Sequence, residues 1–575
     1  MTRSLGAGCL LPAWNPWRDM GEPFLADPQT MAVYPVMRLL CGLSDFSAFL
    51  RLWVVLHTLL AAFFMGALAW RLHKSTAAAA AAAVLSGFNG TFTGRVTFPN
   101  HFAAAAWLPA ILYFQQELSP VGLGVSMAMQ WFAGFPPFSL LSVLAVSVWA
   151  CGQGRQGLKC LIQGGLWALG LAAVQWIPFL ELMGQASRRL VLDPAMARQY
   201  SVAPLQLLKE AFVPQWIHFS PLVGGDPAIV CFYVGLVAWG LAVWAVVRGG
   251  RREVALGAGC AAALLLSLGG HLPGFDAMVF LRIFRFPANW LYLATASLAL
   301  LVASGVAGLR ATAWRWAAVS VLILDLVIFA QAPRAAWSRP SFLSEFPAVA
   351  SSFHGERSLA RIYHTEELRR VWESGVLETE DDYLLMRDFL APSYGAAFGI
   401  SEASSYQTLR LKTANEYLDR MSREGPRSPR VDWAGIEMVV GLKRGARRVS
   451  RESIGLTSRG PARSRVFLER PDAGALRIAS YRPGRVAARV DIAGESGVVL
   501  AEMDYPGWRV FLDGAPVAKS LFAGAFPSIV VPAGGHDVLF VFRPLSVLVG
   551  VLISLLTACA LAFACRRRPI WTWER

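Results

Sequence analysis

Long apolar segments separated by short polar ones make up most of the first 334 residues, and one more lies near the C-terminus. A helix needs about 20 apolar residues to cross a bilayer, and the longer segments approach that length. The pattern predicts a polytopic α-helical membrane domain. The eleven apolar segments lie at 47–70, 76–94, 100–117, 121–133, 137–151, 158–180, 227–247, 254–269, 287–308, 315–331 and 545–565.

Basic residues gather in the short polar connections between these segments, which is the pattern of cytoplasmic loops. If those clusters are cytoplasmic, alternation places 1–46, 185–226, 270–286 and 335–543 outside. The N-terminus then begins outside with no preceding helix, so we expect a truncated chain, a misassigned start, or a first helix that inserts N-terminus-out. The clusters are Arg71 to Lys74, Arg155 to Lys159, Arg248 to Arg252, Arg310 to Arg315 and Arg566 to Arg568.

Composition supports this interpretation, because 55% of the 575 residues are hydrophobic and only 16% are charged. The net charge of +15 is explained by the topology signal, so we expect no nucleic-acid partner. All eight cysteines lie in or near the membrane part, which predicts neither a disulfide scaffold nor a zinc module outside.

Two segments are unusual for lipid-facing helices. Segment 76–94 passes from poly-Ala into Ser86-Gly87-Phe88-Asn89-Gly90-Thr91, and small residues of this kind pack helix against helix. Segment 121–133 ends at Gly134-Phe135-Pro136-Pro137, which stops a helix. Such a break in a membrane is tolerated only against protein or a wet cavity. Ordinary bundle packing is the favoured interpretation of both.

The chain becomes charged and mixed after about residue 335. Alternating runs at 485–492, 498–501 and 508–512, with a hairpin pair at Asp513-Gly514, predict strands. The predicted organisation is an extracytoplasmic first loop, a multi-span domain of about ten segments, a mixed α/β region, a β-sandwich-like module, and a last transmembrane helix with a basic cytoplasmic tail. Their ranges are 1–46, 47–334, 335–463, 464–543 and 544–575.

Proline, glycine and aromatic residues shape the segment before the first long apolar run. Trp14-Asn15-Pro16-Trp17, Gly21-Glu22-Pro23, Asp27-Pro28-Gln29 and Tyr34-Pro35 favour rigid turns over regular helix. Three acids, Asp19, Glu22 and Asp27, lie in this loop. Carboxylates are thereby held near the bilayer without being inside it, where a membrane enzyme could keep a general base.

The two other predicted outer loops are rich in basic residues. An arginine guanidinium matches phosphate oxygens with a planar fork of donors, so arginines at a membrane surface suit a lipid phosphate or pyrophosphate. The alternative is that they only meet anionic head groups. The candidate phosphate ligands are Arg188, Arg189 and His218 in the loop 185–226, and Arg282 and Arg285 in the loop 270–286.

One acid, Asp325, lies in the middle of an apolar segment. Ionisable groups there are costly and usually face a cavity or a partner, so Asp325 is an intramembrane functional candidate. By contrast, no nucleotide-binding motif, phosphate loop, Cys/His metal spacing or serine elbow is present. The acidic run 378–382 suits a solvated face better than a divalent-ion site, so we predict no metal site, and a divalent-ion requirement stays open.

Several of these motifs, taken in order, resemble the bacterial YfhO-like membrane proteins. They are the N-terminal loop motifs, Pro99-Asn100-His101 with Ala106-Trp107-Leu108-Pro109, Gln175 with Pro178, Ser187-Arg188-Arg189, Phe284-Arg285-Phe286-Pro287, Tyr505-Pro506-Gly507-Trp508 with Asp513-Gly514, and Pro532-Ala533-Gly534-Gly535-His536. The likeness covers nearly the whole chain. That family is similar to the GT-C glycosyltransferases, which take a sugar from a polyprenyl-phosphate carrier outside the cytoplasmic membrane.

The resemblance implies an inverting transfer to a cell-envelope glycan or glycolipid such as lipoteichoic acid. A carboxylate of the first outer loop would act as base, while basic residues of later loops would hold the carrier phosphate. Two departures stand out. Related proteins have a helix and an early acid before this loop, and where they often show Gly-His-Pro-Gln this chain has Gly134-Phe135-Pro136-Pro137. Asp27 is then the nearest base candidate, with Glu22 second.

The resulting hypothesis is a GT-C-like glycosyltransferase of the bacterial inner membrane. Its donor would be a polyprenyl-phosphate sugar, with no other cofactor expected, and its partners would be membrane lipid and the envelope acceptor. Two rivals stay open. A transporter or flippase for a lipid-linked precursor would need charges along the membrane centre and an inverted repeat, whereas a non-catalytic envelope scaffold would fit if the missing start is real.

Overall fold

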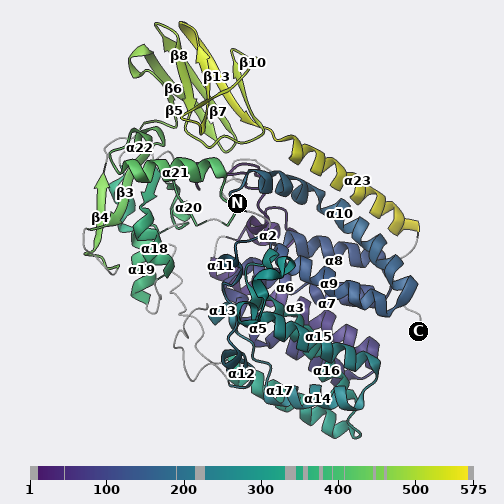
Figure 1. Cartoon of the computed structure of the whole chain (residues 1–575). Helices are drawn as coiled ribbons and strands as arrows, with labels where there is room; N and C mark the ends of the chain where they lie inside the picture. The colour runs from purple at the N-terminus through teal and green to yellow at the C-terminus, as the bar shows by residue number, and fades with distance from the viewer. Residues whose placement is uncertain are drawn as a thin grey trace. The chain divides into compact units, whose positions relative to one another are not determined.

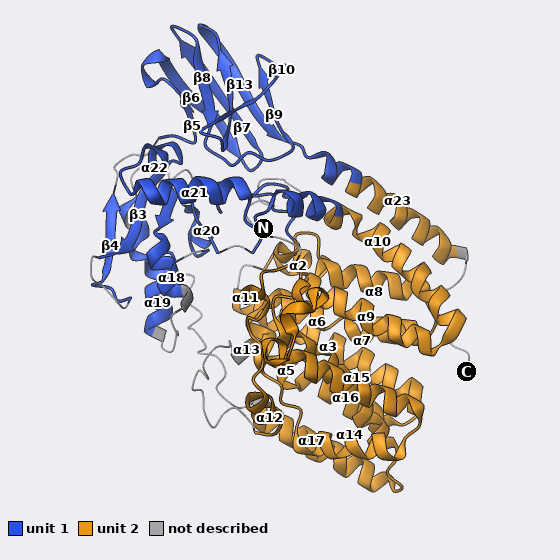
Figure 2. Ribbon diagram, in the orientation of Figure 1, with its two compact units in different colours: residues 1–27, 177–188, 336–549 blue, residues 28–176, 189–335, 550–575 orange. Residues whose placement is uncertain are grey.

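The computed structural model divides the chain into two compact units (Figure 2). One unit comprises 1–27, 177–188 and 336–549, and the other comprises 28–176, 189–335 and 550–575. We refer to them as the mixed unit and the helical unit. The structure describes residues 11–43, 46–188, 191–213, 227–330, 345–353, 361–374, 380–391, 393–406, 408–443, 449–458 and 463–567.

The helical unit is a bundle of apolar helices (Figure 1). All eleven apolar segments predicted from the sequence contain helix, and several are broken into two shorter pieces. The helices are α2 (Pro35–Leu40), α3 (Phe46–His73), α4 (Thr76–Phe88), α5 (Gly90–Gly94), α6 (Pro99–Ala105), α7 (Leu108–Gln116), α8 (Pro120–Phe132), α9 (Pro136–Gly152), α10 (Gly154–Gln185), α11 (Pro194–Ala197), α12 (Pro204–Phe212), α13 (Pro227–Val230), α14 (Leu236–Arg248), α15 (Arg251–Ser267), α16 (Leu291–Ala307), α17 (Thr312–Ala330) and α23 (Leu545–Arg567).

Five of the described helices are long and apolar enough to cross a membrane: α3, α10, α16 with its preceding turn, α17 and α23. This supports a membrane protein. The larger number of spans expected from the sequence stays a prediction. Several remaining apolar segments are shorter because a turn interrupts them, at Asn89 between α4 and α5 and at 106–107 between α6 and α7.

Helix α16 lies at the centre of the bundle and packs against α3, α4, α9, α14, α15 and α17. The poly-Ala face of α4 is also buried, through Ala77, Ala78, Ala81 and Ala82. Gly66 of α3 faces α4 so closely that a Cβ there would lie 3.2 Å from the Ala79 carbonyl oxygen. Small side chains let these backbones approach, so the sequence-based prediction of an interior helix at 76–94 is confirmed.

Helices α10 and α23 pack together through small and hydroxyl-bearing residues. The Ser554 hydroxyl accepts a 2.9 Å bond from the Val174 backbone N–H and lies 2.8 Å from the Leu171 carbonyl oxygen. A Cβ on Gly550 would lie 2.5 Å from the Ala173 carbonyl oxygen. This close approach fixes the last apolar helix against α10.

The mixed unit contains a small α/β sheet with strand order β2-β1-β3-β4. Strand β1 runs parallel to β2 and β3, and β4 is antiparallel to β3. The strands are β1 (Arg361–His364), β2 (Ser401–Glu402), β3 (Ile436–Leu442) and β4 (Ile454–Ser458), and the helices are α18 (Glu366–Ser374), α19 (Glu380–Asp388), α20 (Gly395–Phe398), α21 (Lys412–Glu424) and α22 (Pro429–Trp433).

Two antiparallel sheets follow, with orders β10-β9-β13-β7-β6 and β11-β12-β8-β5, and their buried faces share one hydrophobic core. The predicted β sheets of the C-terminal region are therefore confirmed. Asp513 and Gly514 both have positive φ, 51° and 84°, as a two-residue hairpin requires. The strands are β5 (Val466–Leu468), β6 (Gly474–Arg482), β7 (Arg485–Ile492), β8 (Ser496–Leu500), β9 (Trp508–Leu512), β10 (Ala515–Val517), β11 (Ser520–Phe522), β12 (Phe526–Val531) and β13 (Gly534–Phe542).

Candidate functional site

The N-terminal segment of the mixed unit forms a tight loop between Asn15 and Glu22. Their backbones pair in an antiparallel bridge, with N–H···O distances of 2.9 and 3.0 Å. Asp19, Met20 and Gly21 at its tip all have positive φ, of 49°, 58° and 109°. Gly21 is required there, since a Cβ would lie 2.5 Å from Cζ2 of Trp14. The loop is therefore a specific, closed shape, as its glycine and prolines predicted.

Trp14 anchors this loop to the β-sandwich of the same unit. Its ring is buried, with centroids 4.7 Å from Phe542 and 5.2 Å from Trp508. Its indole N–H donates to the buried Glu502 carboxylate, which also accepts from the Tyr481 hydroxyl. An aromatic ring with a satisfied polar atom contributes a large share of packing energy, so Trp14 fixes the start of the loop.

Backbone hydrogen bonds tie the loop to β2. The Met20 N–H donates to the Glu402 carbonyl at 3.2 Å, and the Glu402 N–H donates to the Trp17 carbonyl at 2.8 Å. On the other side, the Met503 N–H donates to the Met20 carbonyl at 2.8 Å. Residues 17–20 thus link the α/β sheet to the β-sandwich within the mixed unit.

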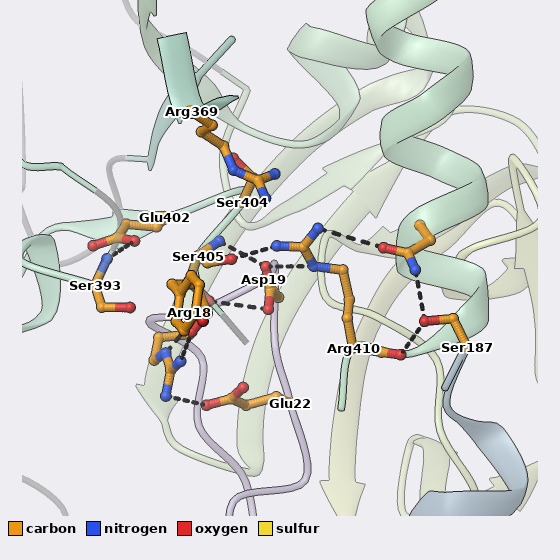
Figure 3. Close-up of polar contacts among 12 residues, drawn as sticks. Arg18, Asp19, Glu22, Ser187, Arg369, Ser393, Glu402, Ser404, Ser405 and Arg410 are labelled. Carbon is orange, nitrogen blue, oxygen red and sulfur yellow. Dashed lines mark hydrogen bonds and ion pairs between the residues drawn. The ribbon is translucent and has the colours of Figure 1, made fainter. Parts of the chain in front are cut away.

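A buried polar cluster forms where the loop meets residues 402–410 (Figure 3). Asp19 accepts from the Ser405 N–H at 2.7 Å and the Ser405 hydroxyl at 3.0 Å, and Arg410 Nε lies 3.2 Å from Asp19 Oδ1. Arg18 donates to the Tyr406 carbonyl at 2.6 Å and lies 3.6 Å from Glu22 Oε1. Asp19 is saturated with donors, which suits a structural role.

Arg410 extends the cluster to the segment 177–188. Its Nη1 lies 3.4 Å from the Asn415 side-chain oxygen, and the Asn415 amide donates to the Ser187 hydroxyl at 2.7 Å. The Ser187 N–H also donates to the Arg410 carbonyl at 3.0 Å. One network, buried at Asp19 and exposed at Ser187, therefore joins three parts of the chain that are far apart in sequence (Figure 3).

Glu22 is almost fully buried, with 3% of its surface exposed. Burial raises the pKa of its carboxyl group to about 7, and the negative charges of Asp19 and Asp27 act in the same direction. Arg18 opposes this shift, as does a 2.7 Å hydrogen bond from the Asn15 side-chain amide. Glu22 can therefore exchange a proton near neutral pH, which is the property of an effective general base.

Glu402 is the second buried carboxyl group with a strongly shifted pKa. Burial raises it to about 8, although the side chain accepts backbone N–H bonds from Ser393 at 2.6 Å and Gly395 at 2.7 Å. The cluster holds four carboxyl groups, Asp19, Glu22, Asp27 and Glu402, all of which act on Arg18 and help to raise its pKa against the opposing effect of burial. Arg18 lies near Glu22 and Arg410 contacts Asp19, while burial favours the protonated form of two of the carboxyl groups, Glu22 and Glu402.

Asp27, the first base candidate from the sequence, is 5% exposed and lies in the same segment as Glu22. It is the last residue of this stretch of the mixed unit, since the helical unit begins at Pro28. The structure thus brings both predicted base candidates into the electrostatic field of Arg18. Among the described residues, no group of three or more His, Cys, Asp or Glu side chains is arranged to hold a metal ion.

The outer-loop arginines of the helical unit have protein partners. Arg282 Nε donates to the Leu192 carbonyl at 2.9 Å, while the Leu192 N–H donates to the Arg282 carbonyl at 3.0 Å. Arg285 Nε donates to the Gln199 side-chain oxygen at 2.8 Å, and its guanidinium lies 5.1 Å from the Phe286 ring. These bonds join the two predicted outer loops. Arg282 and Arg285 are both half-buried.

The remaining predicted site residues lie elsewhere. Arg188 is half-buried in the mixed unit just after α10, whereas Arg189 and His218 lie outside the described residues. Asp325 of α17 accepts from the Tyr233 hydroxyl at 2.6 Å and from the Leu236 N–H, at the start of α14, at 3.2 Å. In this position Asp325 satisfies the N-terminus of a neighbouring helix.

Sequence reasoning did not find Glu402 and Arg410, two main members of the buried cluster. Each is separated from the N-terminal loop by more than 370 positions in the chain, and neither lies in a recognisable motif. Chain separation of this size leaves no local pattern to detect. The loop itself carried a signal because glycine, proline and tryptophan have specific backbone and packing needs.

Comparisons with known proteins give the following. No protein-family model and no curated protein matches the sequence. Among solved structures, the fold is similar to the cryo-EM structure of the arabinofuranosyltransferase AftD from Mycobacteria, with 10% identity and a TM-score of 0.47 over 94% of this chain. An arginine-to-serine mutant of AftD gives 11% identity and a TM-score of 0.41, also over 94% of this chain. The chain covers 54% and 57% of those longer chains.

Proposed function

We propose that this chain is a membrane glycosyltransferase of the GT-C type that moves a sugar from a polyprenyl-phosphate carrier to an envelope glycan or glycolipid. The proposal places it in the bacterial cytoplasmic membrane, with residues 335–463 and 464–543 on the extracytoplasmic side. It is supported by the order of motifs, which resembles that of the YfhO-like proteins, and by the apolar helices. The buried carboxylate loop supplies the chemistry.

The observation that carries the proposal is the Glu22 carboxyl group, whose pKa is about 7. An inverting transfer needs a base that accepts the proton of the attacking hydroxyl, and a base is most effective when its pKa lies near the working pH. Burial brings the pKa of Glu22 into that range, and Asp27 lies in the same buried loop. The resemblance to the YfhO-like proteins makes Asp27 the nearest match to the family's base, so we propose Asp27 as the residue that meets the acceptor hydroxyl, with Glu22 as the second candidate.

Arginine recognition of the carrier phosphate is the second part of the proposal. Arg282 and Arg285 lie in a loop joined by hydrogen bonds to residues 191–199, which restrains their side chains. An arginine restrained before the ligand arrives loses less conformational freedom on binding. Arg188, Arg189 and His218 are proposed as further ligands of the same phosphate.

The test is sugar transfer in membranes containing the full chain, with a panel of radiolabelled farnesyl-phosphate hexoses and pentoses as donors. We expect Asp27→Asn and Arg285→Ala each to reduce transfer at least a hundredfold, because they remove the base and a phosphate ligand. Glu22→Gln should flatten the rise of the rate between pH 6 and 8. The controls are Asp472→Asn, an exposed acid of the β module, and Arg489→Ala, which removes an exposed arginine 3.9 Å from Asp537.

Wild-type rates in both Asp27→Asn and Arg285→Ala, with normal protein levels, would defeat these site assignments. Absence of transfer from every donor, together with a co-purified polyprenyl lipid, would favour the flippase alternative. Absence of both transfer and bound lipid would favour the envelope scaffold.

A further inference from the structure

The five-stranded sheet of the mixed unit has one buried face and one exposed face, as the alternating burial along β7 shows. Residues that lie opposite one another on neighbouring strands share a face. Arg485 of β7 lies opposite Arg482 of β6 and opposite Val541 of β13. Val541 also lies opposite Arg509 of β9. The three arginines are exposed, so they form one basic row across the exposed face.

This row lies at the end of the sheet from which the chain enters α23 (Figure 1). Arg543, also exposed, is the first residue after β13, and α23 begins two positions later at Leu545. The Arg543 N–H donates to the Gly507 carbonyl, just before β9, at 2.8 Å. A fourth arginine therefore adjoins the row. We refer to Arg482, Arg485, Arg509 and Arg543 as the basic rim.

Helix α23 brings the basic rim close to the bilayer. It is one of the described helices long and apolar enough to cross a membrane, and its first residues, 545–549, belong to the mixed unit (Figure 2). Leu545 and Leu548 are exposed, so apolar side chains are available to lipid from the first turn. The four positions from Val541 to Leu545 span at most about 13 Å. The head-group layer fills about 5–8 Å of that distance, and the rest is no larger than the Debye length of about 8 Å at physiological ionic strength.

The positive charge of the basic rim is uncompensated. Among the residues that the structure describes, no acid forms an ion pair with any of its four arginines. The two acids on the strands of this sheet, Asp491 and Asp537, lie toward the opposite end, where Asp491 is opposite Gly535 and Asp537 is 3.9 Å from Arg489. The exposed face is therefore polarised along its strands, with free positive charge at the end next to α23.

We propose that the basic rim binds the anionic head groups of the bilayer phospholipids around α23 and so restrains the β-sandwich at its tether. A guanidinium donates paired N–H bonds to phosphate oxygens. Each basic residue beside an anionic bilayer contributes about fivefold to membrane affinity. The position beside α23 favours lipid over a soluble acidic polymer, which would not require the charge to gather at this end. The inference rests on α23 crossing the bilayer and is independent of sugar transfer.

The experiment compares backbone hydrogen exchange of the full chain in nanodiscs of phosphatidylcholine alone and in nanodiscs with about one third phosphatidylglycerol. We expect exchange in the β6–β7 turn and the turn before β9 to be at least threefold slower in the anionic discs. High salt should remove this difference, because it screens charge. Arg482→Gln combined with Arg485→Gln should also remove it. The matched control combines Arg477→Gln with Arg489→Gln, an exposed pair on the same two strands four positions farther from α23, and should behave as wild type.

Equal exchange of the wild type in the two kinds of disc overturns the inference. So does an equal loss of the difference in the rim variant and the control variant, because the effect would then depend on net charge alone. Should the rim variant fail to fold, Arg509→Gln combined with Arg543→Gln, the other half of the rim, decides.

A soluble polyanion, inorganic polyphosphate, is added to the neutral discs as a further probe. Slower exchange with polyphosphate but not with phosphatidylglycerol would show that an acidic polymer binds here and would reject the lipid. Slower exchange in the anionic discs, in a chain that transfers no sugar from any donor, would reject the proposed function and keep this site.

Discussion

At the scale of single residues, the two shifted carboxyl groups have different surroundings. Glu22 accepts a side-chain amide bond from Asn15, and its neighbours include the negative charges of Asp19 and Asp27. Glu402 instead receives one backbone N–H on each oxygen. We therefore expect a neutral amide side chain to be tolerated in place of Glu22 but not in place of Glu402. This difference gives the two residues opposite mutational signatures.

Stability should fall as the pH rises from about 4.5 to 8. The pKa values of Glu22 and Glu402 in the folded protein, about 7 and about 8, lie above the ordinary value. The folded state therefore holds more protons than the unfolded state in this window, and the protonated carboxyls lose their advantage as the pH passes the folded pKa. Glu22→Gln should flatten this fall and raise stability near pH 8 by about 2 kcal/mol. The measurement is the melting temperature of the purified chain between pH 5 and 9.

Glu402→Gln is the matched contrast. Its amide NH₂ would face the Ser393 or Gly395 backbone N–H, leaving a buried donor unsatisfied at a cost of about 1–3 kcal/mol. We expect a lower melting temperature at every pH. Equal pH profiles for wild type and Glu22→Gln would show that the Glu22 pKa is not shifted.

At the scale of elements, the N-terminal loop depends on one glycine. Gly21→Ala combines a φ of 109° with a Cβ 2.5 Å from the Trp14 ring. We expect a loss of roughly 2 kcal/mol from strain and displaced packing. Hydrogen exchange followed by mass spectrometry should show faster exchange in residues 11–27. Gly514→Ala is the control, because Gly514 also has a positive φ, of 84°, but a Cβ there would meet nothing within 4 Å. Its effect should be smaller and should report the backbone strain alone, without the clash.

The helices and strands could largely be predicted from sequence because their signals are local. The length of the apolar segments identified the helices. The alternation of apolar and polar residues, together with the turn at Asp513-Gly514, identified the strands on either side of that turn. The same methods found the loop with Glu22 and Asp27 through its glycine and prolines. They missed Glu402 and Arg410, because a lone charged residue looks the same whether it is buried or solvated. The cluster exists only after distant segments pack.

At the scale of the whole molecule, the mixed unit is discontinuous: it needs 11–27 and 177–188 to complete what 345–549 begins. A soluble fragment of residues 336–543 should therefore be unstable alone and should bind a synthetic peptide of residues 11–27. The peptide supplies Trp14 to the aromatic cluster and Asp19 to Arg410. Binding is measured through the melting temperature of the fragment. The peptide should raise that temperature by several degrees.

A peptide carrying Asp19→Asn should bind at least tenfold more weakly, because it leaves the half-buried Arg410 without its ion pair to Asp19. A scrambled peptide is the control. A fragment that is equally stable with and without the 11–27 peptide would show that the segment adds nothing to the unit.

The Asp19–Ser405 hydrogen bond joins residues that lie 386 positions apart in the chain. This separation determines when the bond can form during synthesis. Ribosomes add about 5–20 residues per second, so the N-terminal acids wait on the order of 20–80 s for their partners to emerge. Throughout that interval the acids remain hydrated and keep ordinary acidity. A nascent chain therefore carries no poised proton acceptor until nearly all its helices have been inserted.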